Sequence, residues 1–242
     1  MRDHERILVA LDTPDAARAR TLVESLRGRV GGFKIGLELF CSEGPRFVRE
    51  VVESGAPVFL DLKLHDIPNT AAGAAAAAAR LGVSFLTVHA LGGPAMIRRA
   101  VEAANGAARG VGARAPTVLA VTILTSHDDH DLELLGLPRP AALAVERLAA
   151  LAREAGAGGI VCSPREIVSI RRAFGSATIV VPGIRPLGLA VSSDDQLRTE
   201  TAARAVAWGA DHLVVGRPIT QAADPIAAAE TLAREIGGKD PS

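Results

Sequence analysis

The chain has 242 residues, 48% of them hydrophobic, which is enough for one sizeable core and short for two average domains. Lys plus Arg and Asp plus Glu each number 27, and no long basic run occurs, so the composition does not favour nucleic acid as a partner. Glycine, proline or charge interrupts the apolar stretches before they reach the length of a membrane helix, so we expect a soluble protein.

The chain is expected to form one domain over residues 1–242, with a flexible tail from 237 onward. Its first six residues are polar and charged and lead directly into an apolar pattern. No secretory signal is therefore expected, and the cytoplasm is the expected location. Cys41 and Cys162 match no metal or redox spacing, and we expect buried thiols without a role.

Short apolar segments alternate along the chain with longer amphipathic or alanine-rich ones. The short segments predict strands at 6–12, 32–37, 57–64, 85–90, 117–125, 159–163, 178–184 and 212–216. The longer segments predict helices at 15–27, 45–54, 70–81, 94–104, 140–155, 164–174, 199–208 and 225–236. Strands that are apolar on both faces are typical of a parallel sheet covered by helices. The pattern predicts an α/β fold, a (β/α)₈ TIM barrel, with an open doubly wound sheet as the alternative.

Two irregular stretches, at 126–139 and 185–198, lie between a predicted strand and the next helix, which is the functional rim of a barrel. The first contains the sequence His-Asp-Asp-His-Asp at 127–131, which could be a metal-ligand cluster. Because adjacent acids in a loop have no helical spacing, we interpret this segment as a solvated loop. His65 could line the site, but His65 and His89 are both interpreted as hydrogen-bonded packing histidines.

Lysine is rare in this chain, because only Lys34, Lys63 and Lys239 among the 27 basic residues are lysines. Lys239 lies in the polar tail, whereas the other two lie near the carboxyl ends of the second and third predicted strands. Asp61 and Lys63 are two residues apart on a strand, so their side chains share a face and point into the barrel mouth. Asp12 ends the first strand in the same way. The group is either a structural ion-pair cluster or a working site, and barrel anatomy favours the working site.

The charges around Lys63 indicate what it does. A lysine that forms a Schiff base must be neutral, whereas flanking carboxylates favour the charged ammonium. Lys63 is therefore predicted to be a protonated general acid that donates to a carbanion, while Lys34 holds the nearby carboxylate. An aldolase-type Schiff-base enzyme is less favoured.

Glycine-arginine turns follow the seventh and eighth predicted strands, at 183–185 and 216–217. Loops at these two positions commonly bind phosphate in barrels. Glycine lets backbone N–H groups approach an anion closely, and Arg185 and Arg217 offer bidentate contacts. The alternative is two tight turns with surface arginines, and the matching positions favour a phosphate site.

With these residues in place, the chain resembles the orotidine 5′-monophosphate decarboxylase family of the bacterial type over nearly its whole length. The most specific segment is DLKLHDIPNT at 61–70. The other matching segments are ALD at 10–12, FKIG at 33–36, LTS at 124–126, VPGIR at 181–185 and GRP at 216–218.

This resemblance implies a carboxy-lyase that converts orotidine 5′-monophosphate to uridine 5′-monophosphate in the last step of de novo pyrimidine biosynthesis. It implies no metal ion or organic cofactor, and a homodimer in which Asp66 and Thr70 reach the partner subunit's site. The implied catalytic residues are Lys34, Asp61, Lys63 and Asp66, with Lys63 protonating C6 of the pyrimidine. The implied substrate contacts are Asp12 and Lys34 to the ribose, Thr125 or Ser126 to the pyrimidine, and Arg185, Gln196, Gly216 and Arg217 to the phosphate. Asp61, Lys63, Asp66, Ile67, Thr70 and Pro182 complete the implied substrate-binding set.

The stretch between Arg185 and Gln196 is longer and more apolar than the family pattern, and Gln196 is expected to close it over the phosphate. One rival is a magnesium-dependent sugar-phosphate decarboxylase or hexulose-phosphate synthase of the same suprafamily, which carries an acid at the position of Lys34. A second rival is a non-catalytic nucleotide-phosphate-binding barrel, in which Asp61 or Lys63 would be lost. The presence of all three residues favours the decarboxylase.

Overall fold

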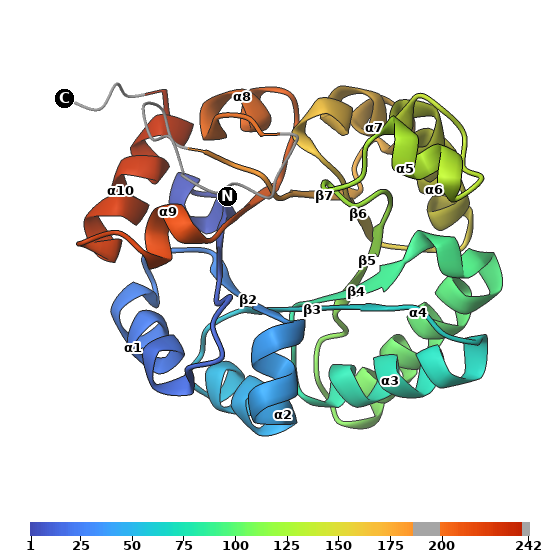
Figure 1. Ribbon diagram of the computed structural model, residues 1–242. Coiled ribbons are helices and arrows are strands. Elements are labelled where there is room, and N and C mark those ends of the chain that lie inside the picture. The colour runs from blue at the N-terminus through green and yellow to red at the C-terminus, as the bar shows by residue number, and fades with distance from the viewer. Residues whose placement is uncertain (186–198, 239–242) are drawn as a thin grey trace.

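The computed structural model describes residues 1–185 and 199–238, and in these residues eight parallel strands form a closed barrel in the order β1 to β8. Figure 1 shows the strands as a central ring with the helices outside it. The predicted (β/α)₈ TIM barrel is confirmed, and the open doubly wound alternative is excluded because β1 pairs with β8. This closure brings the carboxyl ends of all eight strands to one end of the barrel.

All the predicted strands are present, with most boundaries within a few residues. They are β1 (Ile7–Ala10), β2 (Gly32–Gly36), β3 (Val58–Leu64), β4 (Phe85–His89), β5 (Thr117–Val121), β6 (Gly159–Val161), β7 (Thr178–Val181) and β8 (His212–Val215). Hydrophobic residues predominate in these strands because helices cover the outside of the barrel and side chains fill its inside.

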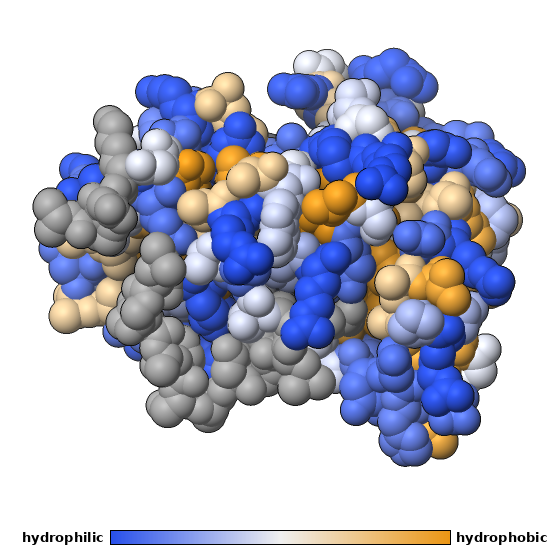
Figure 2. All heavy atoms as spheres, turned by 90° about the horizontal axis from the view of Figure 1, so that it is seen from above, coloured by the Kyte–Doolittle hydropathy of each residue, from blue (hydrophilic) through white to orange (hydrophobic). Residues whose placement is uncertain are grey.

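The α-helices are α1 (Ala16–Leu26), α2 (Leu37–Glu53), α3 (Pro68–Arg80), α4 (Gly93–Gly110), α5 (Asp129–Leu134), α6 (Ala141–Glu154), α7 (Ile167–Phe174), α8 (Ala202–Ala207), α9 (Arg217–Thr220) and α10 (Pro225–Ile236). Short 3₁₀ turns are η1 (Asp3–Arg6), η2 (Ala90–Gly92) and η3 (Pro164–Glu166). On the face drawn in Figure 2, hydrophilic side chains predominate and hydrophobic ones are interspersed. In the described residues no helix is both long and apolar enough to cross a membrane.

Several sequence predictions about elements were wrong. Helix α4 ends at Gly110, six residues after the predicted boundary of 104. Helix α2 begins at Leu37 rather than at 45, because a helical segment precedes a kink at Gly44, where φ is +68°. The segment 127–131 is not an irregular loop, since Asp128 caps α5 by accepting hydrogen bonds from the N–H groups of His130 and Asp131. Strand β5 ends at Val121, four residues before the predicted boundary of 125.

The barrel interior is filled below its carboxyl end by a hydrophobic cluster. This cluster contains Leu8, Ala10, Phe59, Leu119, Val180 and Val214, with Phe85 and Val161 packed against them. The rings of Phe59 and Phe85 meet edge to face, with their centroids 6.1 Å apart. A separate, larger core lies between the strands and the helices. The filled interior forms a floor, so a ligand can enter the barrel only at its ends.

Candidate active site

A cavity of about 720 Å³ opens at the carboxyl ends of the strands, a volume suited to a small organic ligand. Ala10, Phe59, Val121, Val161 and Val214, from five different strands, form its apolar floor. Of the residues predicted for the site, those that line the cavity are Asp12, Lys34, Asp61, Lys63, Thr125, Ser126, Pro182, Arg185, Gly216 and Arg217. The fold therefore brings ten of the predicted residues, from most parts of the chain, to one cavity.

Four charged side chains of alternating sign form a row on the β1–β3 side of this cavity. The ammonium of Lys34 lies 2.7 Å from Asp12 Oδ1 and 3.9 Å from Asp61 Oδ2. The ammonium of Lys63 lies 2.9 Å from the same Oδ2 of Asp61. Asp61 thus contacts both lysines. This agrees with the alternation of acidic residues and lysines that the family resemblance implied.

Burial increases toward the middle of the row. The side chains of Lys34 and Asp61 are each 11% exposed, whereas those of Lys63 and Asp12 are 32% and 59% exposed. An ion pair in such a buried position is screened less by water than a surface pair, so its charges act strongly on anything bound next to them. Lys63 combines a fixed partner with access to the cavity, as a proton donor requires.

The backbone around Lys34 lets the row form. Lys34 lies at the centre of β2, and its carbonyl accepts a hydrogen bond of 2.9 Å from the N–H of Leu11 at the end of β1. Gly36 ends the same strand, and a Cβ atom at this position would lie 3.0 Å from Lys34 Nζ and 3.3 Å from Asp12 Oδ1. The absence of a side chain at Gly36 therefore leaves room for the Lys34–Asp12 pair, a contribution that the sequence analysis missed.

The backbone that places Asp61 next to Lys63 is not that of a regular strand. Between Leu60 and Leu64 the pairing of β3 with β4 changes register, and Lys63 has φ +48°. Lys63 is the one residue other than glycine with positive φ in the described part of the chain. Such backbone is uncommon for a residue with a side chain and often occurs at functional sites.

The predicted residues that follow β3 do not line this cavity. Asp66, Ile67 and Thr70 are all exposed, and Ile67 is 67% exposed. The Asp66 carboxylate accepts a hydrogen bond of 2.6 Å from the N–H of Ile67, just before α3. These side chains are therefore available to a second molecule beside the barrel mouth.

The β7–β8 side of the cavity carries the second group of cations. Arg185 follows β7 and Arg217 follows β8, and both line the cavity together with Pro182 and Gly216. Gly183 has φ +79°, a conformation that glycine adopts without strain. Predicted residue Gln196, and the loop in which it lies, fall outside the described residues. The cavity thus has arginines on one side and the lysine–carboxylate row on the other.

Several lining residues were not predicted. Leu37 begins α2, Cys162 follows β6, and Thr220 and Gln221 lie at the end of α9. Cys162 could have been predicted only from its position directly after a strand, because a single cysteine is not part of any recognisable motif. The predicted burial is correct for Cys162 and wrong for Cys41, which is exposed. The described residues contain no group of three or more His, Cys, Asp or Glu side chains placed to share a metal ion.

Two histidines stack beside the row, with the rings of His65 and His89 5.4 Å apart. Nδ1 of His89 accepts a hydrogen bond of 3.4 Å from the N–H of Leu91, as expected of a packing histidine. The same expectation is wrong for His65, which is exposed. Burial, and then the charges of His65, Lys63 and His127, lower the pKa of His89 to about 4. His89 is therefore neutral at physiological pH.

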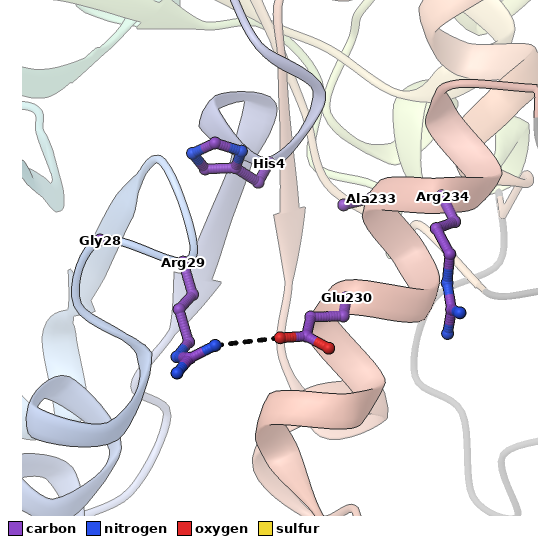
Figure 3. A pocket seen from close by; sticks show the side chains of 6 residues that line it. All are labelled: His4, Gly28, Arg29, Glu230, Ala233 and Arg234. Carbon is purple, nitrogen blue, oxygen red and sulfur yellow. Dashed lines mark hydrogen bonds and ion pairs between the residues drawn. The ribbon is translucent and has the colours of Figure 1, made fainter.

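A second hollow lies at the opposite end of the barrel, between η1, the turn after α1, and α10 (Figure 3). An ion pair of 3.0 Å between Arg29 and Glu230 crosses it, and both side chains are about half exposed. His4 and Arg234 also line it. In this fold the amino-terminal end contributes to stability, whereas catalysis takes place at the carboxyl end.

The fold and the cavity define a class of protein, a TIM-barrel enzyme with a lysine–carboxylate centre on one side of its cavity and arginines at the ends of β7 and β8 on the other. The sequence matches the family described as "Orotidine 5'-phosphate decarboxylase / HUMPS family" over residues 5–232, and the chain belongs to this family.

Individual relatives agree with this assignment. Orotidine 5′-phosphate decarboxylase of Paramagnetospirillum magneticum is 51% identical over 232 residues, which cover 96% of this chain and 98% of that protein. The enzyme of the same name from Anaeromyxobacter dehalogenans is 53% identical over 234 residues, or 96% and 99% of the two chains. The crystal structure of orotidine 5′-phosphate decarboxylase from Lactobacillus acidophilus is similar with a TM-score of 0.83 and 38% identity, covering 95% of this chain and 98% of that one.

Proposed function

We propose that this protein decarboxylates orotidine 5′-monophosphate to uridine 5′-monophosphate, the last step of de novo pyrimidine biosynthesis, in the cytoplasm and without a cofactor. The observation that carries the proposal is the row Asp12–Lys34–Asp61–Lys63 on one side of a cavity that has arginines on the other. A nucleotide monophosphate has a matching arrangement, because its phosphate and its reacting base are at opposite ends of the molecule. Family membership supports the same substrate.

The cavity suggests how each part of the nucleotide binds. Arg185 and Arg217, with the backbone at Pro182 and Gly216, hold the phosphate, and the family resemblance assigns Gln196 to the phosphate as well. Asp12 and Lys34 bind the ribose, and Thr125 or Ser126 binds the amide edge of the pyrimidine. Energy from phosphate binding, far from the reacting carbon, can then be used to hold the base in position against the charged row.

The chemical step follows from the placement of Asp61 and Lys63. When the bond from C6 to the carboxylate breaks, its electron pair stays on C6, and carbon dioxide leaves. The Lys63 ammonium donates a proton to C6, which leaves neutral lysine that solvent reprotonates. Asp61 holds that ammonium, 2.9 Å away. In the proposed complex Asp61 is also the residue next to the departing carboxylate. Charge is therefore placed in advance for the transition state, which is a large source of rate enhancement.

The active unit in this proposal is a homodimer. Asp66, Ile67 and Thr70 are exposed beside the mouth of their own barrel and do not line its cavity. We assign them to the partner subunit's site, where Asp66 extends the alternating row and acts with Lys34, Asp61 and Lys63 in catalysis. Exposed Leu37 and Leu91 lie on the segments after β2 and β4, on either side of β3 in the barrel order, and provide apolar surface for such an interface.

The magnesium-dependent rival of the same suprafamily is disfavoured by Lys34. A divalent cation would need oxygen ligands where the Lys34 ammonium already contacts Asp12 at 2.7 Å and approaches Asp61 at 3.9 Å. A second cation in that position would be repelled by the ammonium. The non-catalytic rival is disfavoured because both Asp61 and Lys63 are present and paired.

The deciding experiment is turnover of orotidine 5′-monophosphate by purified protein in the presence of EDTA. The proposal expects undiminished decarboxylation, whereas dependence on added Mg²⁺ would support the first rival. Lys63→Ala should abolish turnover while uridine 5′-monophosphate still binds. Binding of the nucleotide without turnover by the wild-type protein would support the non-catalytic rival and would refute the proposal.

A further inference from the structure

The change of register in β3 leaves one residue of β4 opposite three residues of the catalytic strand. Leu60 pairs with Leu86, and the next pair is Leu64 with Val88. Between these pairs, residues 61–63 of β3 lie opposite Thr87 alone. Regular main-chain pairing cannot satisfy all of these residues, so something else must hold the irregular segment.

The hydroxyl of Thr87 supplies that support. Its Oγ1 accepts a hydrogen bond of 2.8 Å from the N–H of Lys63 and donates one of 2.9 Å to Asp61 Oδ1. Thr87 is fully buried and Asp61 is 8% exposed, so water does not compete strongly for these groups. A hydroxyl has one proton to donate and lone pairs to accept, and Thr87 uses both capacities on the two charged residues of β3.

These two hydrogen bonds fix the orientation of the Asp61 carboxylate. Oδ1 is held by Thr87, and the other oxygen, Oδ2, faces Lys63 at 2.9 Å and Lys34 at 3.9 Å. The bond from the Lys63 N–H holds the backbone of the residue that has φ +48°. The buried Thr87 hydroxyl therefore fixes the orientation of the Asp61 carboxylate, the backbone conformation of Lys63 and the geometry of the ion pair between them.

We propose that Thr87 is a positioning residue for decarboxylation, which holds the Asp61 carboxylate and the Lys63 ammonium in the geometry for proton donation. This inference rests on the proposed function. Thr87 does not line the cavity, so it acts through Asp61 and Lys63 rather than on the substrate.

The test compares three variants by steady-state kinetics with orotidine 5′-monophosphate. Thr87→Val keeps the shape of the side chain and removes the hydroxyl, and we expect kcat to fall on the order of 10- to 100-fold because the reacting groups lose their alignment. KM and the affinity for uridine 5′-monophosphate should change by no more than about threefold, since binding contacts remain. Thr87→Ser retains the hydroxyl and should recover most of kcat.

Thr122→Val is the matched control. Thr122 is also fully buried in the barrel, but its hydroxyl donates to the carbonyl of Val161, 3.3 Å away, and to neither charged residue. A similar loss of kcat in Thr122→Val, an equal loss in Thr87→Ser and Thr87→Val, or a kcat for Thr87→Val close to that of the wild type would each overturn the inference. If Thr87→Val does not fold, Thr87→Ser and Thr87→Ala provide the same comparison, because they differ only by the hydroxyl.

Crystal structures of the wild type and Thr87→Val separate this inference from the proposed function. If the wild type fails to decarboxylate orotidine 5′-monophosphate, the proposed function is refuted and the structures still test the positioning role. We expect the valine variant to lose positive φ at Lys63 or the contact between Lys63 Nζ and Asp61 Oδ2. Persistence of both would show that Thr87 does not position the pair.

Discussion

At the scale of single residues, the candidate site depends on close approaches that one extra atom would disturb. The Lys34–Asp12 pair passes next to Gly36, where a Cβ atom would lie within 3.0 Å of the ammonium. The neighbours of that Cβ are the ends of flexible side chains, which can move away. Substitution at Gly36 should therefore change the charged row more than it changes the fold.

Gly36→Ala is expected to lower kcat/KM roughly 10-fold, because Lys34 and Asp12, to which we assign the ribose, must shift from their present positions. Its φ of −93° is open to alanine, so unfolding free energy should fall by only about 1 kcal/mol, as for alanine at a helix N-cap. Kinetics and urea denaturation measure the two effects. The control is Gly106→Ala in α4, where the nearest side-chain atom would be 4.0 Å away. A normal kcat/KM for Gly36→Ala would contradict this account of the row.

The lowered pKa of His89 predicts how the stability of the protein depends on pH. Its pKa in the folded protein is about 4, below the ordinary value of 6.5, so the unfolded chain binds a proton more readily. The stability that neutral His89 provides is therefore complete above about pH 6.5 and is lost as the pH falls toward 4. His89→Asn keeps an acceptor for the Leu91 N–H and cannot titrate. Its urea midpoint should fall less steeply than that of the wild type between pH 7 and 4.5, and parallel curves would rule out this role for His89.

At the scale of elements, the sequence was sufficient to predict the fold because burial on both faces gives strands an unmistakable composition. The helix predicted at 225–236 has the boundaries of α10, since Asp224 caps it and Pro225 begins it. The kink at Gly44 concealed the start of α2, because a proline at 45 resembles a helix beginning. Helix α5, with six residues and one buried side chain, is too short to show a period.

The same limit applies to the site. Lysines and acids at strand ends predicted the charged row, because the topology of a barrel brings those ends together. The support from Thr87 could not be predicted, because it depends on a register change between β3 and β4 that no local pattern encodes. A buried threonine in a strand also satisfies ordinary strand propensity, so nothing in the sequence sets it apart.

Helix α8, which lies between β7 and β8, is held at its start by another helix. Glu235 of α10 is 7% exposed, and its carboxylate accepts hydrogen bonds of 2.9 and 3.4 Å from the N–H groups of Ala202 and Ala203. Glu235→Ala leaves these groups without that acceptor and should lower the unfolding free energy by about 1–3 kcal/mol. This corresponds to a decrease in Tm of roughly 2–4 °C per kcal/mol for a chain of this size.

Glu230→Ala provides the control on the same helix, because the Glu230–Arg29 pair in Figure 3 is about half exposed and contributes little. Calorimetry of both variants distinguishes loss of the cap from a general effect of removing an acid from α10. Glu235→Gln should lie near the wild type, since its amide oxygen can still accept. An equal effect of Glu230→Ala and Glu235→Ala would contradict the capping role.

At the scale of the whole molecule, the proposed site is divided between two subunits. Asp61 and Lys63 are 2.9 Å apart and must belong to the same cavity, whereas Asp66 is exposed at the edge of its own barrel. In a twofold dimer each site would receive the first two residues from one subunit and the third from the other. The division can be tested because defects in different subunits can complement each other.

Lys63→Ala and Asp66→Ala homodimers should each be inactive, and co-expression of the two chains should restore turnover. In a heterodimer one site carries both defects and the other carries none. Random assembly gives half heterodimers, so about a quarter of all sites should be native. Lys63→Ala mixed with Asp61→Ala is the negative control, because each site of that heterodimer keeps one defect. Two affinity tags isolate the heterodimers for assay. Absence of recovery with Asp66→Ala would show that Asp66 does not act across the interface. Recovery in the control would contradict the assignment of Asp61 and Lys63 to one site.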